Sequence, residues 1–167
     1  MEGVLFPEIW INVAKKTGIS ELERTTRDEP DYDRLMHYRM DILRREGVTL
    51  GDIQAVIATL TPLDGVPEFM EWLRMHFQVL ILSDTFYQFA MPLVTQIGSP
   101  TIFCHNLMMD AAGMISGYRL RQPDAKRAVV DALRHDLKMR VIAMGDSYND
   151  TSMLMAADQG VLFCPPQ

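Results

Sequence analysis

The stretch Arg140–Asp150 reads RVIAMGDSYND, an apolar run of strand length followed at once by glycine and a cluster of polar side chains. Residues 78–85, QVLILSDT, have the same form: an apolar run and then a polar group. Runs that are apolar throughout indicate strands buried on both faces, as in parallel sheets covered by helices. Helical patterns separate these runs along the chain, so the sequence predicts an α/β fold with a buried parallel sheet.

Outside these strands, hydrophobic periodicity divides the chain into two regions with different patterns. Residues 7–62 are almost purely helical, with expected helices at 7–18, 32–45 and 53–60. After Pro62, expected helices alternate with expected strands at 78–82, 101–104, 140–144 and 160–163, and a hairpin is expected around residues 107–120. We therefore expect a core domain of residues 1–9 and 66–167, interrupted by a helical cap of residues 10–65.

The composition limits the classes of function. A chain of 167 residues fits one domain, and 22 acidic against 16 basic residues give a net charge of −6. That balance argues against a nucleic-acid partner and against an anionic membrane surface. The two cysteines form no CxxC pair, the four histidines show no metal-ligand spacing, and there is no long apolar run. We expect a soluble, cytoplasmic protein.

The residues that follow the strands are candidates for chemistry, because ligands of open α/β sheets bind beyond the carboxyl ends of the strands. Asp146 and Asp150 lie four residues apart, and their hard oxygen atoms suit Mg²⁺. The alternative is that Asp150 or Asn149 only caps a helix. Ser83 is read either as a phosphate donor or as a helix cap, and Lys126 either as a phosphate ligand or as a surface lysine.

Together these residues carry a family resemblance. The chain resembles the haloacid dehalogenase-like phosphohydrolases in the order of four features. These are an acid at an apolar start, a strand that ends in Ser, a Lys, and a strand that ends in Gly-Asp-x-x-x-Asp. Four segments look most like the bifunctional phosphoserine phosphatase/homoserine phosphotransferase subgroup: EGVLFPEIW at 2–10, TTRD at 25–28, ILSDTF at 81–86 and GDSYND at 145–150. The resemblance implies a Rossmann-like parallel sheet with a helical cap inserted after the first motif.

The resemblance also implies catalytic and metal-binding roles. Ser83 would hydrogen-bond the transferring phosphoryl oxygens, and Lys126 would neutralise their charge. Asp146 and Asp150, with the backbone carbonyl of Glu2, would hold Mg²⁺. The Glu2 side chain would act as general acid and base.

Further residues are implied in substrate binding. Arg39 matches the arginine that binds the substrate carboxylate, although a solvent-facing helix residue is an equal reading from the pattern alone. Glu8 lies near an acid that binds the substrate amine, with a spacing one residue shorter than usual. Asn149 matches a polar residue near the phosphate, and Asp84, next to Ser83, is also implied in substrate binding.

The implied activity is a Mg²⁺-dependent phosphoserine phosphatase acting through an aspartyl-phosphate, with phosphoserine:homoserine phosphotransfer as a second activity. The small-molecule partners would be phosphoserine, serine or homoserine. The sequence does not define the oligomeric state, and a homodimer is one option. The alternatives are a phosphatase for another small phosphate ester and a catalytically dead regulator that binds phosphate esters.

One part of the family pattern falls outside the chain. The nucleophilic Asp stands two residues before the acid/base, which places it just before Met1, together with the first strand. We therefore expect the chain as written to be inactive. It would be either a part of a longer active protein, the reading we favour, or a short form that has lost catalysis. Neighbouring strands without this strand would have unpaired backbone groups.

Overall fold

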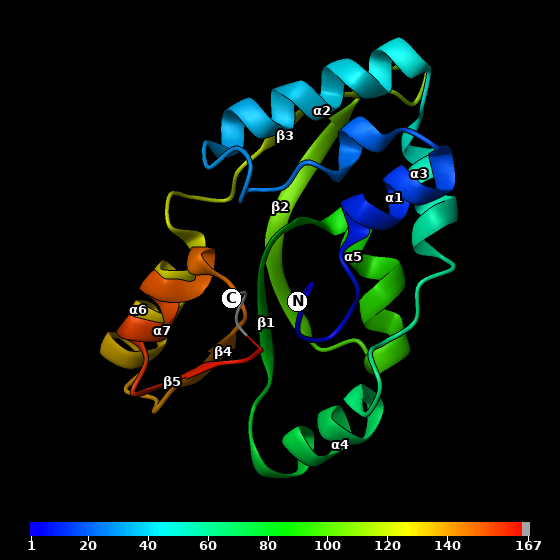
Figure 1. Cartoon of the computed structure of the whole chain (residues 1–167). Helices are drawn as coiled ribbons and strands as arrows, with labels where there is room; N and C mark the ends of the chain where they lie inside the picture. The colour runs from blue at the N-terminus through cyan, green and yellow to red at the C-terminus, as the bar shows by residue number, and fades with distance from the viewer. Residues whose placement is uncertain (165–167) are drawn as a thin grey trace.

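The computed structural model describes residues 1–164 (Figure 1). The helices are α1 (Ile9–Thr17), α2 (Tyr32–Glu46), α3 (Leu50–Ile57), α4 (Val66–His76), α5 (Tyr87–Val94), α6 (Ala125–His135) and α7 (Thr151–Ala156). Short 3-10 helices are η1 (Ser20–Glu23), η2 (Thr95–Ile97) and η3 (Tyr148–Asp150). The strands are β1 (Leu80–Phe86), β2 (Thr101–Met109), β3 (Ile115–Arg119), β4 (Ile142–Gly145) and β5 (Gln159–Leu162). This order of helices and strands confirms the α/β class.

The parallel strands lie in two sheets, where the sequence predicted one. β1 pairs with β2 in parallel, and β2 pairs with β3 antiparallel, as the predicted hairpin requires. β4 and β5 form a separate parallel pair. Within residues 1–164, β1 and β4 each have one edge without a strand partner. The N-terminal residues contribute only an isolated bridge between Glu2 and Phe6, so they supply no strand to join the two sheets.

The bounds of β1 differ from the expected strand in a way that shapes the site. The expected strand ended at Leu82, whereas β1 continues to Phe86. Its pairing with β2 slips within this extension, because Leu82 lies opposite Phe103 but Phe86 lies opposite His105. The residues between Leu82 and Phe86 therefore form a bulge. Bulges re-aim side chains and are common beside active sites.

The helices of the N-terminal third begin and end where local signals place them. The Asp31 side chain caps α2 by accepting the Arg34 N–H, and Gly47 ends the helix with a φ of 66°. Thr49 and Asp52 form a capping box, so α3 begins at Leu50, three residues before the expected start. Caps satisfy backbone donors that the first turn leaves free, which is why these starts are sharp.

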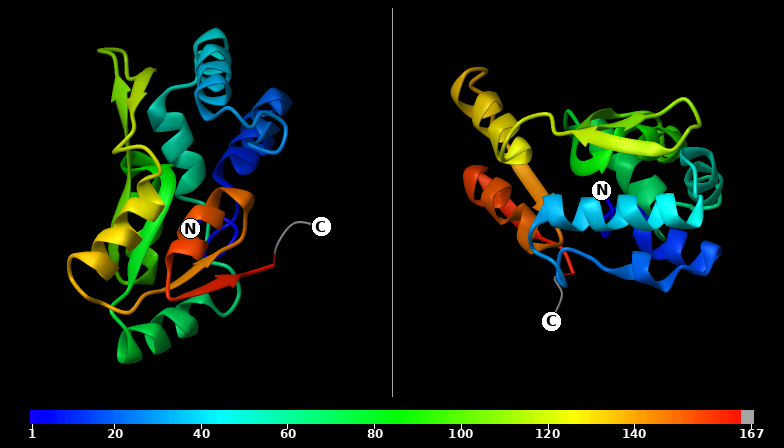
Figure 2. Two further views of the ribbon diagram at one scale, coloured as in Figure 1. Left: turned by 90° about the vertical axis from the view of Figure 1, so that its left-hand side faces the viewer. Right: turned by 90° about the horizontal axis from the view of Figure 1, so that it is seen from above.

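Two hydrophobic clusters hold the molecule together. The larger one joins buried residues of α1 to α5 with β1, β2 and β3, including the fully buried Phe6, Ile9 and Phe89. The smaller one consists of Val130, Ala143 and Met153, from α6, β4 and α7. Figure 2 shows α6 and α7 as a pair beside β1, apart from the helices α1 to α3. The division into a core and a cap at residues 9 and 65 stays a prediction.

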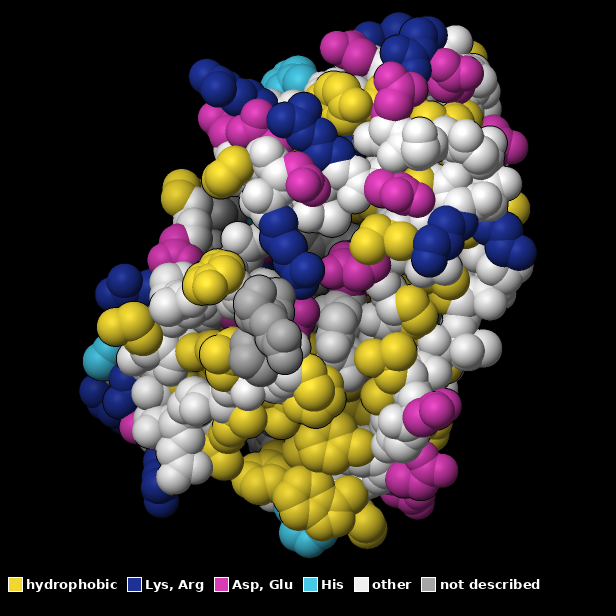
Figure 3. Space-filling view, viewed as in Figure 1, with side chains coloured by type: hydrophobic (Ala, Val, Ile, Leu, Met, Phe, Trp, Pro, Cys, Tyr) yellow, Lys and Arg dark blue, Asp and Glu magenta, His cyan; other side chains and the backbone are white. Residues whose placement is uncertain are grey.

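Apolar side chains also gather on the surface at the α4 end of the molecule (Figure 3). Trp72 and Phe77 are exposed on and after α4, and Leu162 and Phe163 are exposed at the end of β5. All four residues of β5 are exposed, in contrast to the expected buried strand. No helix within residues 1–164 is long and apolar enough to cross a membrane.

Candidate active site

The bulge of β1 presents a buried hydroxyl at the end of the strand. The Ser83 Oγ accepts a hydrogen bond from the Thr85 backbone N–H at 3.3 Å, and both side chains are buried. This local bond turns the backbone of Ser83–Thr85 out of the regular ladder with β2. The sequence placed these residues just after the strand; the structure places them inside it.

Lys126 lies between two carboxylates that come from different elements. Its Nζ is 2.6 Å from Asp84 Oδ2, at the β1 bulge, and 2.7 Å from Asp150 Oδ1, at the start of α7. Lys126 is 9% exposed, which excludes the reading of a solvated surface lysine. Burial alone would lower the pKa of Lys126, but the two carboxylates outweigh burial and raise it. The ammonium is therefore charged at neutral pH.

Asp150 divides its two oxygens between the lysine and the loop that follows β4. Oδ1 binds Lys126, and Oδ2 accepts the backbone N–H groups of Asp146 at 3.1 Å and Ser147 at 3.3 Å. Burial raises the pKa of Asp150, and the Lys126 charge lowers it below its usual value. Asp150 precedes α7 but makes no side-chain cap bond to it; its side chain instead completes a capping box with Ser147 at the start of η3. Its role as a metal-site residue stays a prediction.

Asp146 points its carboxylate toward the N-terminal segment. A Cβ placed on Gly3 would lie 2.2 Å from Asp146 Oδ2, so the backbone of Gly3 and this carboxylate are in close contact. Burial, together with the neighbouring charge of Asp150, raises the pKa of Asp146. A nearby cation would stabilise the ionised form of a carboxylate in this electrostatic environment. Within residues 1–164, no three acidic, His or Cys side chains gather as a ready metal site.

Glu2 and Arg39 lie on the side of the helices α1 and α2. Glu2 Oε2 accepts the Ile9 N–H at the start of α1 at 2.9 Å, and burial raises the pKa of Glu2. Arg39 is 6% exposed, which decides against the solvent-facing reading. Its guanidinium lies 4.5 Å above the Trp10 ring and donates from Nη2 to the Arg24 carbonyl at 2.7 Å.

The Arg39 Nε is buried and has no hydrogen-bond partner within the described chain. Burial lowers the pKa of Arg39 to about 10, and the charges of Glu2 and Glu8 act in the opposite direction. An unpaired buried donor on a charged group is costly, so this nitrogen is a good candidate for a ligand contact. Glu8 itself is exposed at the N-terminal end of α1.

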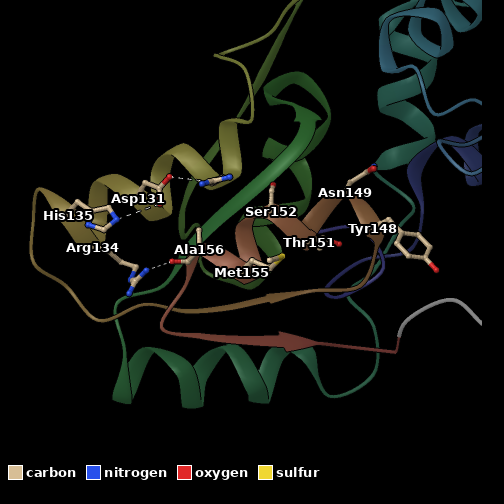
Figure 4. Close-up of a pocket in the computed structure, with 10 residues that line it drawn as sticks. Asp131, Arg134, His135, Tyr148, Asn149, Thr151, Ser152, Met155 and Ala156 are labelled. Carbon is tan, nitrogen blue, oxygen red and sulfur yellow. Dashed lines mark hydrogen bonds and ion pairs between the residues drawn. The ribbon is translucent and has the colours of Figure 1, made fainter.

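Asn149 is exposed and connects the loop after β4 to the N-terminal third of the chain. Its Nδ2 donates to Thr26 Oγ1 at 3.3 Å. It also lines a groove of about 790 Å³ between α6 and α7, together with residues such as Arg134 and Tyr148 (Figure 4). Ser83, Lys126 and Asp146 do not line that groove, so we place the site by its charged groups and not by the groove.

Two residues of this neighbourhood had no signal in the sequence. Tyr32 fits the apolar face of its helix by spacing, but its hydroxyl donates to the Asp84 carbonyl at 3.0 Å. His105, one of the four histidines without metal-ligand spacing, is 4% exposed and has its Nε2 3.8 Å from Asp84 Oδ1. Neither contact can be read from local spacing, because each joins residues more than 20 positions apart.

Comparison with known proteins shows the family to which the chain belongs. The chain is 58% identical, over all of its 167 residues, to a phosphoserine phosphatase ThrH of Pseudomonas aeruginosa, and covers 81% of that protein. It is 57% identical to a phosphoserine phosphatase of Pseudomonas syringae pv. tomato, of which it covers 70%. A substrate-bound phosphoserine phosphatase structure superposes with a TM-score of 0.82 at 18% identity, over 99% of this chain and 83% of that one.

The fold likeness extends to an apo phosphoserine phosphatase structure, with a TM-score of 0.80 at 18% identity over 99% of this chain and 84% of that one. Residues 6–158 match the sequence model of the haloacid dehalogenase-like hydrolases. The family resemblance inferred from Ser83, Lys126 and the Asp146–Asp150 loop is thus confirmed, and the chain belongs to the haloacid dehalogenase-like hydrolase family.

Proposed function

We propose that this chain carries the substrate site of a Mg²⁺-dependent phosphoserine phosphatase, with transfer of the phosphoryl group to homoserine as a second activity. The relatives that share more than half of its residues bear the name phosphoserine phosphatase. The family resemblance implies a route through an aspartyl-phosphate, with the nucleophilic carboxylate in the position before Met1.

The observation that carries the proposal is the Nε of Arg39, which is buried and has no hydrogen-bond partner within residues 1–164. A phosphate ester of an amino acid has two anionic ends. Lys126 supplies charge for the phosphoryl end, and Arg39 supplies a buried guanidinium for the carboxylate end, where bidentate binding favours arginine. The charge of Glu2 acts on Arg39, and Glu8 lies near enough to act on both, which supports the predicted acid near the substrate amine.

The donor set suits Mg²⁺. Asp146 would hold the ion with its carboxylate, supported by Asp150 and by the Glu2 carbonyl next to Gly3. Mg²⁺ commonly keeps several water ligands and takes only one or two protein carboxylates beside a substrate phosphate, so a closed cluster of three side chains is not required. When bound, the ion would supply charge neutralisation at the phosphoryl group.

The chain's own residues then have distinct tasks. Ser83 and Lys126 would hold the phosphoryl oxygens, with Asn149 nearby. Glu2, whose raised pKa keeps a proton available closer to neutral pH, would donate that proton to the leaving alkoxide and take one from the attacking water or alcohol. Phosphoryl transfer depends mostly on such positioning and charge neutralisation.

Calorimetry on residues 1–167 tests the proposal, together with a phosphate-release assay on a variant that carries the implied strand and nucleophilic Asp before Met1. With Mg²⁺ present, phosphoserine should bind at least about tenfold more tightly than inorganic phosphate, because only the ester reaches both cations. Lys126→Met should abolish binding of both ligands. Equal affinity for phosphoserine and for an ester without amine and carboxylate, such as glycerol 3-phosphate, would contradict it. Tight binding with no phosphate release would favour a phosphate-ester-binding regulator.

A further inference from the structure

We propose that Asp84 and His105 form a positioning pair that holds the Lys126 ammonium at the phosphoryl site. The proposal rests on the proposed function for the identity of the ligand, but the position of the lysine can be measured without any substrate. The family resemblance implies that Asp84 binds the substrate; the proposed pair gives Asp84 a positioning role as well.

Asp84 is placed to act on Lys126 from a different element. It belongs to the bulge of β1, a strand that packs against both hydrophobic clusters, whereas Lys126 lies on α6. The contact of 2.6 Å between them therefore joins β1 to α6 at the site. The Tyr32 hydroxyl fixes the backbone at the same residue by donating to the Asp84 carbonyl.

His105 has one ring orientation and one tautomer that fit its surroundings. Its Nδ1 accepts the backbone N–H of Arg121 at 3.1 Å, so the neutral ring carries its proton on Nε2. Nε2 faces Asp84 Oδ1 at 3.8 Å, which is longer than a hydrogen bond but favourable for a dipole beside a carboxylate. The rings of Tyr32 and Phe86 pack around the imidazole with centroids 6.5 and 6.4 Å away.

The number of lysine protons explains what this arrangement achieves. An ammonium has three N–H donors; one bonds Asp150 Oδ1, and Asp84 Oδ2 forms an ion pair with the same nitrogen at 2.6 Å. At least one donor remains for a phosphoryl oxygen. A lysine side chain is flexible, and with Asp150 alone the ammonium could rotate about one contact; a second carboxylate from another element fixes it in place. His105 in turn fixes which oxygen of Asp84 faces the lysine.

Replacement of Asp84 distinguishes a positioning role of this residue from a purely electrostatic one. Asp84→Asn removes a negative charge near a bound anion, so a purely electrostatic role predicts tighter binding of inorganic phosphate. The positioning role predicts the opposite: about tenfold weaker binding, measured by calorimetry, as is usual when a group that orients a ligand-binding residue is lost. Tighter or unchanged binding would overturn the proposal.

A matched pair at His105 tests the second member and remains decisive if Asp84→Asn does not fold. His105→Gln retains an amide N–H near the position of Nε2, whereas His105→Asn retains only the acceptor for Arg121. We expect His105→Gln to bind phosphate within about twofold of the parent chain and His105→Asn to resemble Asp84→Asn. The reverse order would show that His105 acts only on the Arg121 backbone and would overturn its role.

The ammonium itself provides a readout that a general loss of stability would not reproduce. In ¹⁵N NMR, ammonium protons held in buried ion pairs exchange slowly enough to be seen. The Lys126 signal should be present in the parent chain and in His105→Gln, and lost in folded His105→Asn. A signal that persists in His105→Asn would contradict positioning by this pair. If these results hold but phosphoserine binds no better than phosphate, the proposed function fails and the positioning pair stands.

Discussion

Gly3 illustrates at the scale of one residue how the N-terminal segment shapes the loop after β4, which carries the proposed Mg²⁺ ligand Asp146. It has a φ of +75°, and an added Cβ would lie 2.2 Å from Asp146 Oδ2. Gly3→Ala should therefore displace the Asp146 carboxylate. We expect Mg²⁺ affinity, measured by calorimetry, to fall by about 10- to 100-fold, the range seen when groups that support a metal ligand are changed.

Gly113→Ala is the matched control for this substitution. Gly113 has a similar φ of +79°, but an added Cβ there would meet nothing within 4 Å. Both variants carry the backbone penalty of an alanine in the left-handed region, about 1–2 kcal/mol. Only Gly3→Ala should lose Mg²⁺ affinity. Equal affinities in the two variants would show that Gly3 does not position Asp146.

Individual site residues can be predicted from the sequence where they belong to a recognisable motif. Ser83, Lys126 and Asp150 are predicted from their places after strands and at a helix start. The structure pairs Lys126 with Asp150 and with Asp84, the residue next to Ser83. The burial of Arg39 was undecided from the pattern, since a helix position beside Leu35 and Met36 can face either way. The contacts of Tyr32 and His105 with Asp84 depend on how distant segments pack, and no local pattern encodes them.

At the scale of elements, Asp158 connects α6, β4 and β5. Its carboxylate accepts the Val141 N–H at 2.8 Å and binds Arg134 Nη2 at 2.9 Å. The backbone hydrogen bond from Val141, followed by Arg134, lowers the pKa of Asp158 below its usual value. A carboxyl group with a lowered pKa in the folded state stabilises the fold above its unfolded pKa, and this contribution is lost as the pH falls through the folded pKa.

Asp158→Asn should therefore lower the melting temperature by a few degrees at pH 7, and this difference should shrink as the pH falls below about 4. Asp136→Asn serves as the control, because Asp136 ends the same helix and makes no side-chain hydrogen bond within residues 1–164. Thermal unfolding followed by circular dichroism at several pH values gives both results. A difference that grows toward acid would contradict the assigned sign.

The elements themselves were largely predictable, and the errors have physical causes. The prediction places α2, between Asp31 and Gly47, within one residue. It misses the first three residues of α3, whose capping box lies before the apolar pattern begins. The end of β1 was placed wrongly, because the polar residues Ser83–Thr85 read as a loop while the bulge keeps them in the strand. The exposure of β5 was missed because a short apolar run does not reveal what covers it.

At the scale of the whole molecule, the two sheets leave one edge of β1 and one edge of β4 without strand partners in the described chain. The Met1 ammonium is buried, which lowers its pKa, and it lies close enough to Lys126, Asp146 and Asp150 for their charges to act on it. A strand leading into Met1 would therefore approach the site. Unpaired edges have backbone groups available for such a strand.

We predict that a variant extended before Met1 by an apolar segment of about seven residues, a usual strand length, with Asp directly before Met1, melts at a higher temperature than residues 1–167. The added strand would pair with β1 and β4 and replace the buried ammonium by a peptide bond. An extension of equal length made of Gly and Ser is the control. Equal melting temperatures for the two extensions would contradict this account of the sheet.

Arg39 offers the most direct test of the central claim, that the site recognises an amino-acid phosphate by both ends. Binding of phosphoserine and of phosphoethanolamine, which lacks the carboxylate, is measured by calorimetry with Mg²⁺ for the parent chain, Arg39→Met and the exposed control Arg34→Met on the same helix.

The account predicts that the parent chain and Arg34→Met prefer phosphoserine by about 1.5–3 kcal/mol, the contribution of a hydrogen bond to a charged group. Arg39→Met should lose this preference and still bind phosphoethanolamine as the parent does. An undiminished preference for phosphoserine in Arg39→Met would contradict the claim.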